Sequence, residues 1–280
     1  MVKRKVKILR LLSICIILLA GGSTVLSQEV DTLETEELPK YWDHTECVRN
    51  LFIESDTTKA RFGEGAEIDF LLERSSDCEE VGPVSRRIAL RYLEWGDTTY
   101  DDIASESRSK KDLFKEGLSW AKTSIRQDST DHENYEIAST AFAALLTVSR
   151  LRTQAKLADS VRIYAESAIR LHPENDRAHH ILGRWHYEVS KLGWLTKFLS
   201  RVVFREPQDG SFEKAEEHFN KAIELDNIST HRFWLGMAYL EQGKKEQALE
   251  QFRIIQTLPY VQHNDDYLKE EAKKLIEKHS

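Results

Sequence analysis

A repeat of helix pairs in the C-terminal third of the chain is the feature that most constrains its fold. Residues 213–226 align with residues 246–259 at a shift of 33 positions, and the alignment pairs Ala215 with Ala248. Apolar residues recur every three or four positions in both copies, as in amphipathic helices. The small residue lets two helix axes approach closely where they cross. Because one helix pair cannot bury its apolar face alone, consecutive pairs are expected to stack into an array.

This spacing is typical of tetratricopeptide (TPR) repeats, which are paired helices of about 34 residues. The clearest copy runs from Leu235 to Pro259, and three earlier pairs show the same arrangement with longer spacing. Residues 267–278 carry apolar side chains on one face and are expected to cap the array. We therefore predict an all-α fold over residues 82–280: a TPR-like helical-repeat superhelix of about four helix pairs plus a C-terminal capping helix.

The first 27 residues are typical of a secretory signal peptide. The first ten residues include five Lys and Arg residues, and Leu11–Ala20 is apolar. Small or polar residues follow up to a cleavage site before Gln28. We expect a periplasmic or secreted protein with a cleaved signal peptide, and an uncleaved N-terminal membrane anchor is the alternative. Cleavage removes five positive charges and no negative ones, so the formal charge changes from −7 to −12. This acidic balance argues against nucleic acid as a partner.

Residues 28–81 are expected to form an acidic tether followed by a short N-terminal segment. Cys47 and Cys78 are the two cysteines that remain after cleavage. In an oxidising compartment they are expected to form one disulfide, and two separate buried thiols are the alternative. The cysteines show neither a CxxC motif nor a Cys/His spacing, so we expect neither a metal site nor a cofactor.

A stretch in the third helix pair resembles a known family. From His180 to Phe204 it carries, in order, Gly183-Arg184-Trp185, Glu188, Lys191-Leu192 and Trp194-Leu195. This pattern resembles the regulator of microtubule dynamics family, whose TPR-like domain has a Gly-Arg-Trp helix followed by a Lys-Leu-x-Trp-Leu insertion. The resemblance implies the TPR-like fold and identifies the chain as similar to an exported, bacterial-type member. Family members are best known as microtubule- or membrane-contact-associated proteins, but an exported chain is not expected to meet cytosolic microtubules.

The expected function is non-catalytic binding of a protein or peptide in the groove that the first helix of each pair lines. The candidate contact residues are Tyr135, Phe142, His179, Arg184, His186, Glu188, Arg232 and Tyr239. Arg184 and Glu188 are four residues apart and share one helix face. They form either an ion pair that ties the helix to its neighbour or a charged pair that faces the groove.

An insertion in the third pair supports an alternative function, the binding or transfer of phospholipid or another apolar ligand. Its segment from Trp194 to Phe204 is apolar on nearly every side. The candidate wall consists of Trp194, Leu195, Phe198, Leu199 and Val202. A helix packed on both sides inside the superhelix is the other interpretation, because apolar runs usually belong to a core. Some TPR domains of the family that the chain resembles are associated with phospholipid binding.

Enzymatic activity is not expected. His179 and His186 lie seven residues apart, whereas a zinc-binding histidine pair on a helix prefers a spacing of four. The sequence contains no glycine-rich phosphate loop, nucleophile elbow or kinase signature. These absences favour a binding protein over a catalyst.

Overall fold

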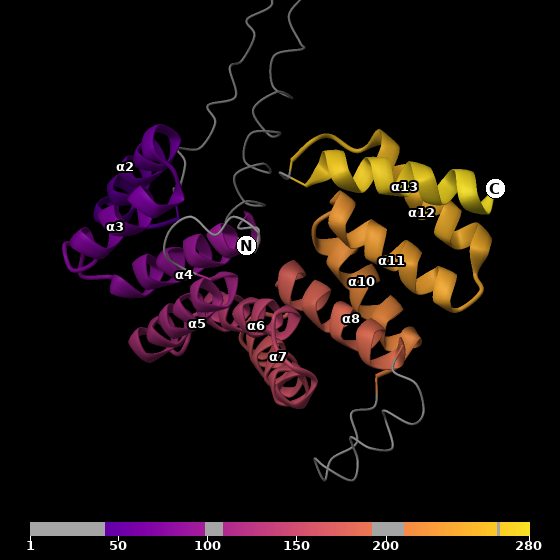
Figure 1. Ribbon diagram of the computed structural model, residues 1–280, viewed down its shortest axis with the longest axis horizontal. Helices are drawn as coiled ribbons and strands as arrows, with labels where there is room; N and C mark the ends of the chain where they lie inside the picture. Colours follow the sequence, from indigo (N-terminus) through magenta and orange to yellow (C-terminus); the bar gives the residue numbers. More distant parts are fainter. Residues whose placement is uncertain (1–42, 99–108, 192–209, 262–263) are drawn as a thin grey trace, which may run out of the picture. The chain divides into compact units, whose positions relative to one another are not determined.

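The computed structural model describes residues 43–98, 109–191, 210–261 and 264–280 (Figure 1). Every regular element in these ranges is an α-helix, which confirms the all-α prediction. The expected signal peptide and most of the expected tether, within residues 1–42, lie outside the described residues. None of the described helices is both long and apolar enough to cross a lipid bilayer.

Four helix pairs follow one another along the chain, and a last helix closes the series (Figure 1). The pairs are α4 (Val81–Thr98) with α5 (Lys110–Gln127), α6 (His132–Thr147) with α7 (Leu151–Leu171), α8 (Asp176–Lys191) with α10 (Phe212–Leu225), and α11 (Ser229–Glu241) with α12 (Lys245–Thr257). The second helix of each pair also packs on the next helix in sequence. The last helix, α13 (Asp265–His279), packs on both helices of the fourth pair. This is the predicted arrangement of four pairs and a cap.

Two further helices, α2 (Glu46–Phe62) and α3 (Glu64–Arg74), precede the four pairs. They pack on each other, and α3 packs on α4. Their buried apolar side chains form one cluster with those of α4: Val48, Leu51, Ile68, Leu71, Val84 and Ile88. The helical unit therefore begins upstream of residue 82, where the sequence pattern places the start of the repeats.

A disulfide joins Cys47 in the first turn of α2 to Cys78 in the loop between α3 and α4. The two cysteines are 31 positions apart in sequence. Closing a loop of that size in the unfolded chain stabilises the folded state by about 3 to 4 kcal/mol. The bridge therefore ties the start of α2 to the loop that leads into α4.

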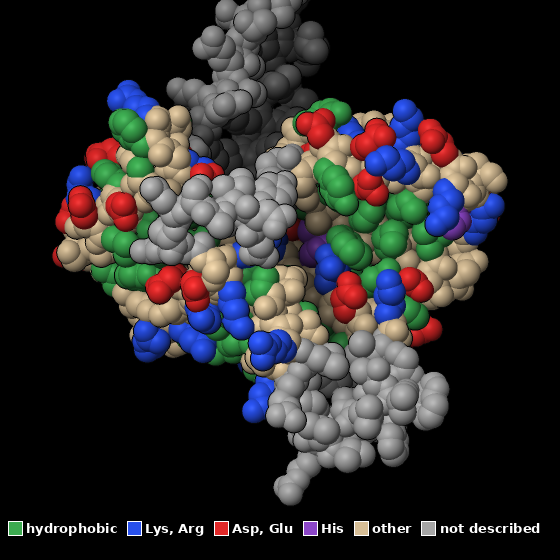
Figure 2. All heavy atoms as spheres, viewed as in Figure 1, with side chains coloured by type: hydrophobic (Ala, Val, Ile, Leu, Met, Phe, Trp, Pro, Cys, Tyr) green, Lys and Arg blue, Asp and Glu red, His purple; other side chains and the backbone are tan. Residues whose placement is uncertain are grey.

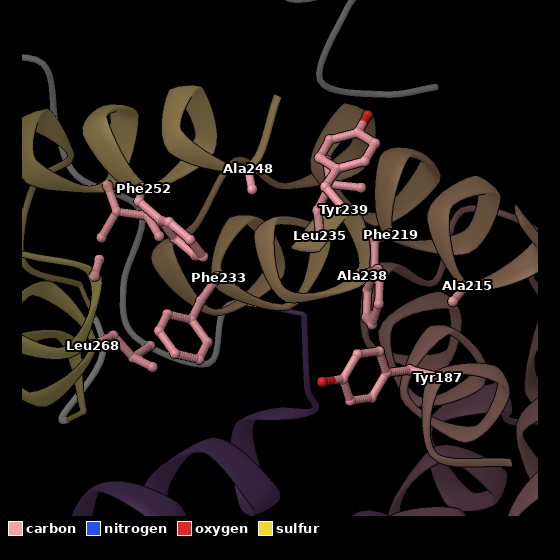
Figure 3. Close-up of a cluster of buried hydrophobic side chains, with 12 residues drawn as sticks. Tyr187, Ala215, Phe219, Phe233, Leu235, Ala238, Tyr239, Ala248, Phe252 and Leu268 are labelled. Atoms are coloured by element: carbon pink, nitrogen blue, oxygen red, sulfur yellow. The ribbon is translucent and has the colours of Figure 1, made fainter. Parts of the chain in front are cut away.

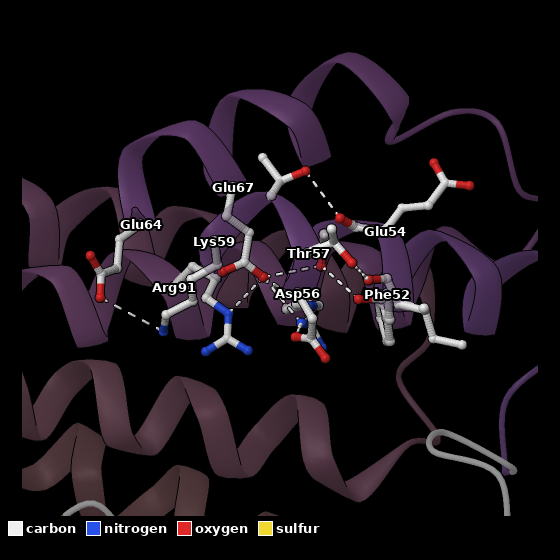
Figure 4. A network of polar contacts seen from close by, with 12 residues as sticks. Phe52, Glu54, Asp56, Thr57, Lys59, Glu64, Glu67 and Arg91 are labelled. Carbon is white, nitrogen blue, oxygen red and sulfur yellow. Dashed lines mark hydrogen bonds and ion pairs between the residues drawn. The ribbon is translucent and has the colours of Figure 1, made fainter. Parts of the chain in front are cut away.

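A buried ionic cluster holds α3 against α4 (Figure 4). The carboxylate of Glu67 is fully buried and lies 3.1 Å from Arg87 and 3.0 Å from Arg91. Ser55 of α2 donates a hydrogen bond to the same carboxylate oxygen at 3.0 Å. Breaking a buried pair leaves an uncompensated charge, which costs about 3 to 5 kcal/mol. The cluster therefore specifies how these three helices pack.

Local sequence signals set several helix boundaries. Ser109 accepts a hydrogen bond from the backbone N–H of Asp112, and Ser211 accepts one from that of Lys214, so both serines cap helix N-termini. Between α11 and α12, Gly243 has a φ of 74°, in the left-handed region that favours glycine. These residues explain where α5 and α10 begin and where the chain turns between α11 and α12.

Close helix crossings depend on glycine in two successive pairs. A Cβ atom at Gly183 would lie 2.7 Å from the ring of Phe219, and one at Gly236 would lie 2.5 Å from the ring of Phe252. Figure 3 shows Phe219 and Phe252 in one apolar cluster that runs from α8 to α13. The predicted role of small residues at the crossings is therefore confirmed, because no larger side chain fits beside these rings.

Candidate binding cleft

The first helices of the four pairs line a cleft of about 420 Å³ together with residues at the N-terminal end of α2, and we call it the inner cleft. Its apolar lining consists of Phe52, Pro83, Leu90, Ile137, Ile181 and Ile228. Figure 2 shows a histidine side chain between basic and acidic side chains in a hollow near the centre of the view. The cleft lies where the sequence analysis expects the binding groove.

Arg86 connects α4 to α6 at one wall of the inner cleft. Its guanidinium forms ion pairs with Asp131 and Glu133 and donates a hydrogen bond to Asn134 at 3.0 Å. Asp131 also caps α6 by accepting a hydrogen bond from the backbone N–H of Glu133. The charge of Arg86 is therefore balanced within the protein.

Arg87 forms the wall on the α2 side. It is buried and forms ion pairs with Asp56 and Glu67. Its guanidinium also lies over the ring of Phe52, 4.6 Å from the ring centre. A cation over an aromatic ring is an attractive contact. Arg87 therefore holds the ring of Phe52 at this wall of the cleft.

Glu136 lies on the inner face of α6, with a side chain that is 12% exposed. Arg177 of α8, whose side chain is 68% exposed, forms an ion pair with Glu136 at 3.8 Å, and Asn175 donates a hydrogen bond to Glu136. Burial raises the pKa of Glu136 to about 7; Arg177 opposes this rise, and the charges of Glu133 and Asp176 add to it. Glu136 is therefore protonated more easily than an exposed glutamate.

A chain of hydrogen bonds links α8 to α11 at the floor of the inner cleft. Nε2 of His231 lies 3.1 Å from Oδ2 of Asp176, and Nδ1 of His231 lies 3.1 Å from Nδ1 of His180. Burial acts to raise the pKa of Asp176, but the hydrogen bond and charge of His231, with the charge and backbone N–H of Arg177, together outweigh burial and lower this pKa. Burial lowers the pKa of His180 well below its ordinary value, and the charges of His231 and Arg184 add to this.

These contacts connect the inner cleft to a carboxylate. A carboxylate oxygen only accepts hydrogen bonds, so His231 donates from Nε2 to Asp176. The Nδ1 atom of His231 faces that of His180, which lines the inner cleft. The cleft therefore contains an imidazole that is joined to Asp176 through His231.

The structure places Arg184 and Glu188 on the same face of α8 as Arg177 and Ile181, which line the cleft. The two side chains form an ion pair at 3.3 Å. The guanidinium of Arg184 lies over the ring of Trp234 in α11, 3.3 Å from its centre. Arg184 thus connects α8 to α11 beside the cleft through Trp234, whereas its ion pair with Glu188 lies within α8.

Tyr135 and Phe142 lie on the side of α6 that packs against α7. The ring of Tyr164 in α7 is 6.2 Å from that of Tyr135 and 5.1 Å from that of Phe142. Phe142 is buried in a cluster that also contains Trp185. These two candidate contact residues pack between helices and do not line the inner cleft.

His179 and His186 face α10, where both approach His218. Nδ1 of His179 lies 3.1 Å from Nδ1 of His218, and the ring of His186 stacks on that of His218 at 5.6 Å. Burial lowers the pKa of His186 and of His218 to about 4. The structure brings these candidates together, but between two helices of one pair instead of in the inner cleft.

Arg232 and Tyr239 of α11 are also outside the lining of the inner cleft. Arg232 donates hydrogen bonds of 2.6 Å to Asn227 and to Gln251 of α12. Tyr239 is buried in the cluster of the last pairs. Both side chains therefore connect α11 to neighbouring segments of the chain.

The proposed apolar wall of Trp194, Leu195, Phe198, Leu199 and Val202 lies outside the described residues. The lipid-binding alternative therefore stays a prediction. In the described ranges, no group of three or more His, Cys, Asp and Glu side chains is arranged to hold a metal ion.

Sequence reasoning missed Glu136, Arg177, His180 and His231. The signal was present for α8, because Arg177, Ile181, Arg184 and Glu188 recur at the spacing of one helix face. Glu136 and His231 had no comparable local signal, since each becomes a cleft residue only through the packing of helices from different pairs. The spacing of first helices alone does not say which face points inward.

The four stacked pairs, the glycine crossings and the cleft along the first helices define a TPR-type helical-repeat protein. A thermophilic TPR protein of Thermus thermophilus has the same fold, with a TM-score of 0.59 at 15% sequence identity; the match covers 81% of this chain and 98% of that protein. The chain belongs to the family of regulator of microtubule dynamics proteins 1-3, whose model matches residues 59–280. This confirms the resemblance found in the third helix pair.

Two relatives show how far the similarity extends. Regulator of microtubule dynamics protein 3 of Mus musculus is 28% identical over 196 residues, which cover 68% of this chain and 41% of the mouse protein. The Bos taurus protein of the same name is 30% identical over 191 residues, or 68% of this chain and 40% of that protein. The chain thus matches less than half the length of either relative.

Proposed function

We propose that this chain is a non-catalytic scaffold that binds an extended segment of a partner protein in the inner cleft. The observation that carries this proposal is the cleft itself, because α2 and the first helix of every pair contribute to one cavity of about 420 Å³. Helical-repeat arrays use such extended concave surfaces for binding. The apolar lining offers contact area, and the charged residues at its walls offer specificity.

Site-specific photocrosslinking tests this proposal directly. A photoreactive amino acid replaces Thr230, which lines the inner cleft on α11. The matched control replaces Ile163 on α7, which is 45% exposed and lies outside the lining. In the native host, we expect a discrete crosslinked polypeptide from position 230 and none from position 163.

A second variant shows whether the crosslink depends on the cleft. Thr140→Trp fills part of the lining on α6 and should abolish the crosslink from position 230. Circular dichroism and thermal melting establish that this variant keeps its helices. The proposal is wrong if position 163 crosslinks the same polypeptide, if position 230 crosslinks none, or if Thr140→Trp changes nothing while the protein stays folded.

We also propose that the protein acts outside the reducing cytosol, in the periplasm or after secretion. The disulfide between Cys47 and Cys78 supports this location, because such bonds persist in oxidising compartments. The test is the intact mass of protein isolated from its own cells after alkylation without reduction. A chain that begins at Gln28 and takes up no label is expected. A chain that keeps Met1 and an intact disulfide would favour the membrane-anchored alternative, and labelled Cys47 and Cys78 would contradict export.

A further inference from the structure

We propose that the inner cleft recognises a large apolar side chain of the partner protein, such as leucine or phenylalanine, and disfavours charged side chains of either sign. This inference deepens the proposed function and rests on it. It names the chemistry of the partner residue that enters the cleft. Two observations carry it. The titratable side chains of the lining are engaged within the protein, and the surface that they leave to an occupant is mostly apolar.

Two arginines of the lining, Arg86 and Arg87, are mostly buried and each pairs with two carboxylates. The partners are Asp131 and Glu133 for Arg86, and Asp56 and Glu67 for Arg87. An acidic side chain from a partner protein would have to displace one of these carboxylates. A buried carboxylate that loses its cation is strongly destabilised. These two arginines therefore do not select an acidic occupant.

The third arginine of the lining, Arg177, favours neither sign of charge. It pairs with Glu136 at 3.8 Å, and Asn175 donates a hydrogen bond to the same carboxyl group. Arg177 is 68% exposed, so an acidic residue that paired with it would remain in water and gain little. Glu136 is only 12% exposed, so a basic residue would have to lose its hydration to replace partners that are already present.

The histidines of the lining are engaged in a similar way. His231 contacts Asp176 and His180, each at 3.1 Å. The ring of His44 stands edge-on against that of Phe52, with 5.3 Å between the ring centres. Each titratable side chain of the lining thus has a partner within the protein, and an incoming charge would find none that is uncompensated.

The apolar part of the lining is available to an occupant. Pro83, Leu90 and Ile181 are only half-buried, and all three line the inner cleft. A leucine or phenylalanine side chain placed against them removes apolar surface of both partners from water, which favours binding. The cavity of about 420 Å³ therefore fits an apolar residue that anchors the bound segment.

The polar walls favour a protein segment over a lipid acyl chain as the source of this apolar group. A hydrocarbon chain would cover Arg86 and Glu136 without offering them a hydrogen bond, and such desolvation is costly. The backbone amide groups on both sides of a leucine residue can donate and accept hydrogen bonds. A peptide therefore matches the apolar lining and the polar walls together.

The test uses fluorescein-labelled, end-capped octapeptide pools with randomised flanks of serine, threonine, asparagine and glycine. Both central residues are leucine, glutamine, lysine or glutamate, and fluorescence anisotropy measures binding to the full protein. We expect the leucine pool to bind about tenfold more tightly than each of the others, as for the burial of one leucine side chain. Its dissociation constant should change by less than about twofold between roughly 0.05 and 0.5 M NaCl, because no new ion pair forms.

Matched variants test whether this preference comes from the inner cleft. Ile181→Ser removes apolar surface from the lining, whereas Ile163→Ser removes the same side chain from an exposed position on α7. Leu90→Ser on α4 and Leu171→Ser at the end of α7 repeat the comparison, since Leu171 is 44% exposed and outside the lining. The two lining variants should lose most of the preference for leucine, and the two controls should keep it. Thermal melting identifies any loss of folding, and the second pair decides if Ile181→Ser unfolds.

The outcomes separate this inference from the function on which it rests. Binding of the glutamine, lysine or glutamate pool at least as tightly as the leucine pool would overturn the inference and leave peptide binding in place. Folded lining variants that keep the preference would also overturn it. Palmitate that binds more tightly than the leucine pool and displaces it would assign the apolar lining to a lipid chain instead. If no pool binds at all, both the inference and the proposed peptide-binding function are wrong.

Discussion

Arg184 of α8 lies over the indole ring of Trp234 in α11, with its guanidinium carbon 3.3 Å from the ring centre. The two residues belong to successive helix pairs, so the contact joins one repeat to the next. The same guanidinium forms an ion pair with Glu188 at 3.3 Å. Arg184 was a candidate partner-binding residue from sequence, and its contacts show that it also connects the repeats.

Arg184→Ala should lower the free energy of unfolding by about 1 to 2 kcal/mol, because a partly desolvated cation–ring contact is lost. Glu188→Ala is the control and should cost less than about 0.5 kcal/mol, as for an exposed ion pair. Urea denaturation followed by circular dichroism measures both. Equal losses would show that the stacking on Trp234 adds little to the ion pair within α8. A charge-reversed Arg184→Glu that keeps its stability but loses partner binding would support its role in the groove.

Gly236→Ala should destabilise the protein by about 1 to 3 kcal/mol, because the added methyl group overpacks the crossing of α11 and α12. Its Cβ atom would lie 2.5 Å from the ring of Phe252, which is fully buried. Gly82→Ala in α4 is the matched control, since its nearest neighbour is 3.7 Å away. The control should be neutral or stabilising by less than about 1 kcal/mol. Thermal melting compares the two, and a larger loss for Gly82→Ala would contradict the crossing argument.

The packed histidines of α8 and α10 predict a loss of stability in mild acid. Burial lowers the pKa of His186 and of His218 to about 4, below the value of about 6.5 in an unfolded chain. The unfolded chain therefore binds more protons between these values, so stability is complete above pH 6.5 and falls as the pH drops toward 4. The expected loss over this window is about 2 to 4 kcal/mol.

Urea unfolding at pH 7, 6 and 5 checks this sign and slope. In His218→Gln the free energy of unfolding should change less with pH. The variant lacks one titrating ring, and His186 no longer has the charge of His218 beside it. An unchanged slope in that variant would place the acid sensitivity elsewhere. A rise in stability with acid would contradict the depressed pKa values.

Reduction of the Cys47–Cys78 disulfide should lower the free energy of unfolding by about 3 to 4 kcal/mol. The double variant Cys47→Ser with Cys78→Ser should show the same loss and no further change on reduction. The effect should be largest for α2 and α3, and hydrogen exchange measures each helix separately. Equal exchange in oxidised and reduced protein would show that the bond contributes little to this packing.

Much of the fold could be predicted from short-range pattern. The alignment of Ala215 with Ala248 and the small residues Gly183 and Gly236 identify helix pairs, because each crossing needs a small residue opposite a large one. The N-terminal pair was harder. Its apolar residues are few, and α2 and α3 become part of the array through the buried Glu67 cluster with α4.

The candidate site was predicted less well, and His179 and His180 show why. The two are adjacent in sequence, but His179 contacts His218 of α10 and His180 contacts His231 of α11. Successive helix residues point about 100° apart, so a small error in the inward direction exchanges a cleft residue for a packing residue. Phe142 and Tyr239 were chosen for their position in a repeat and are buried between helices.

The sequence by itself determined that the chain forms paired helices, how many pairs follow one another and which family they belong to. These properties depend on periodicity and on residues close together along the chain. Only the tertiary structure decided which face of each first helix points inward and which distant groups meet there. Glu136, Arg177 and His231 come together from three different helices. Their chemistry depends on burial and on the proximity of each other's charges. Both arise only when the helix pairs have stacked.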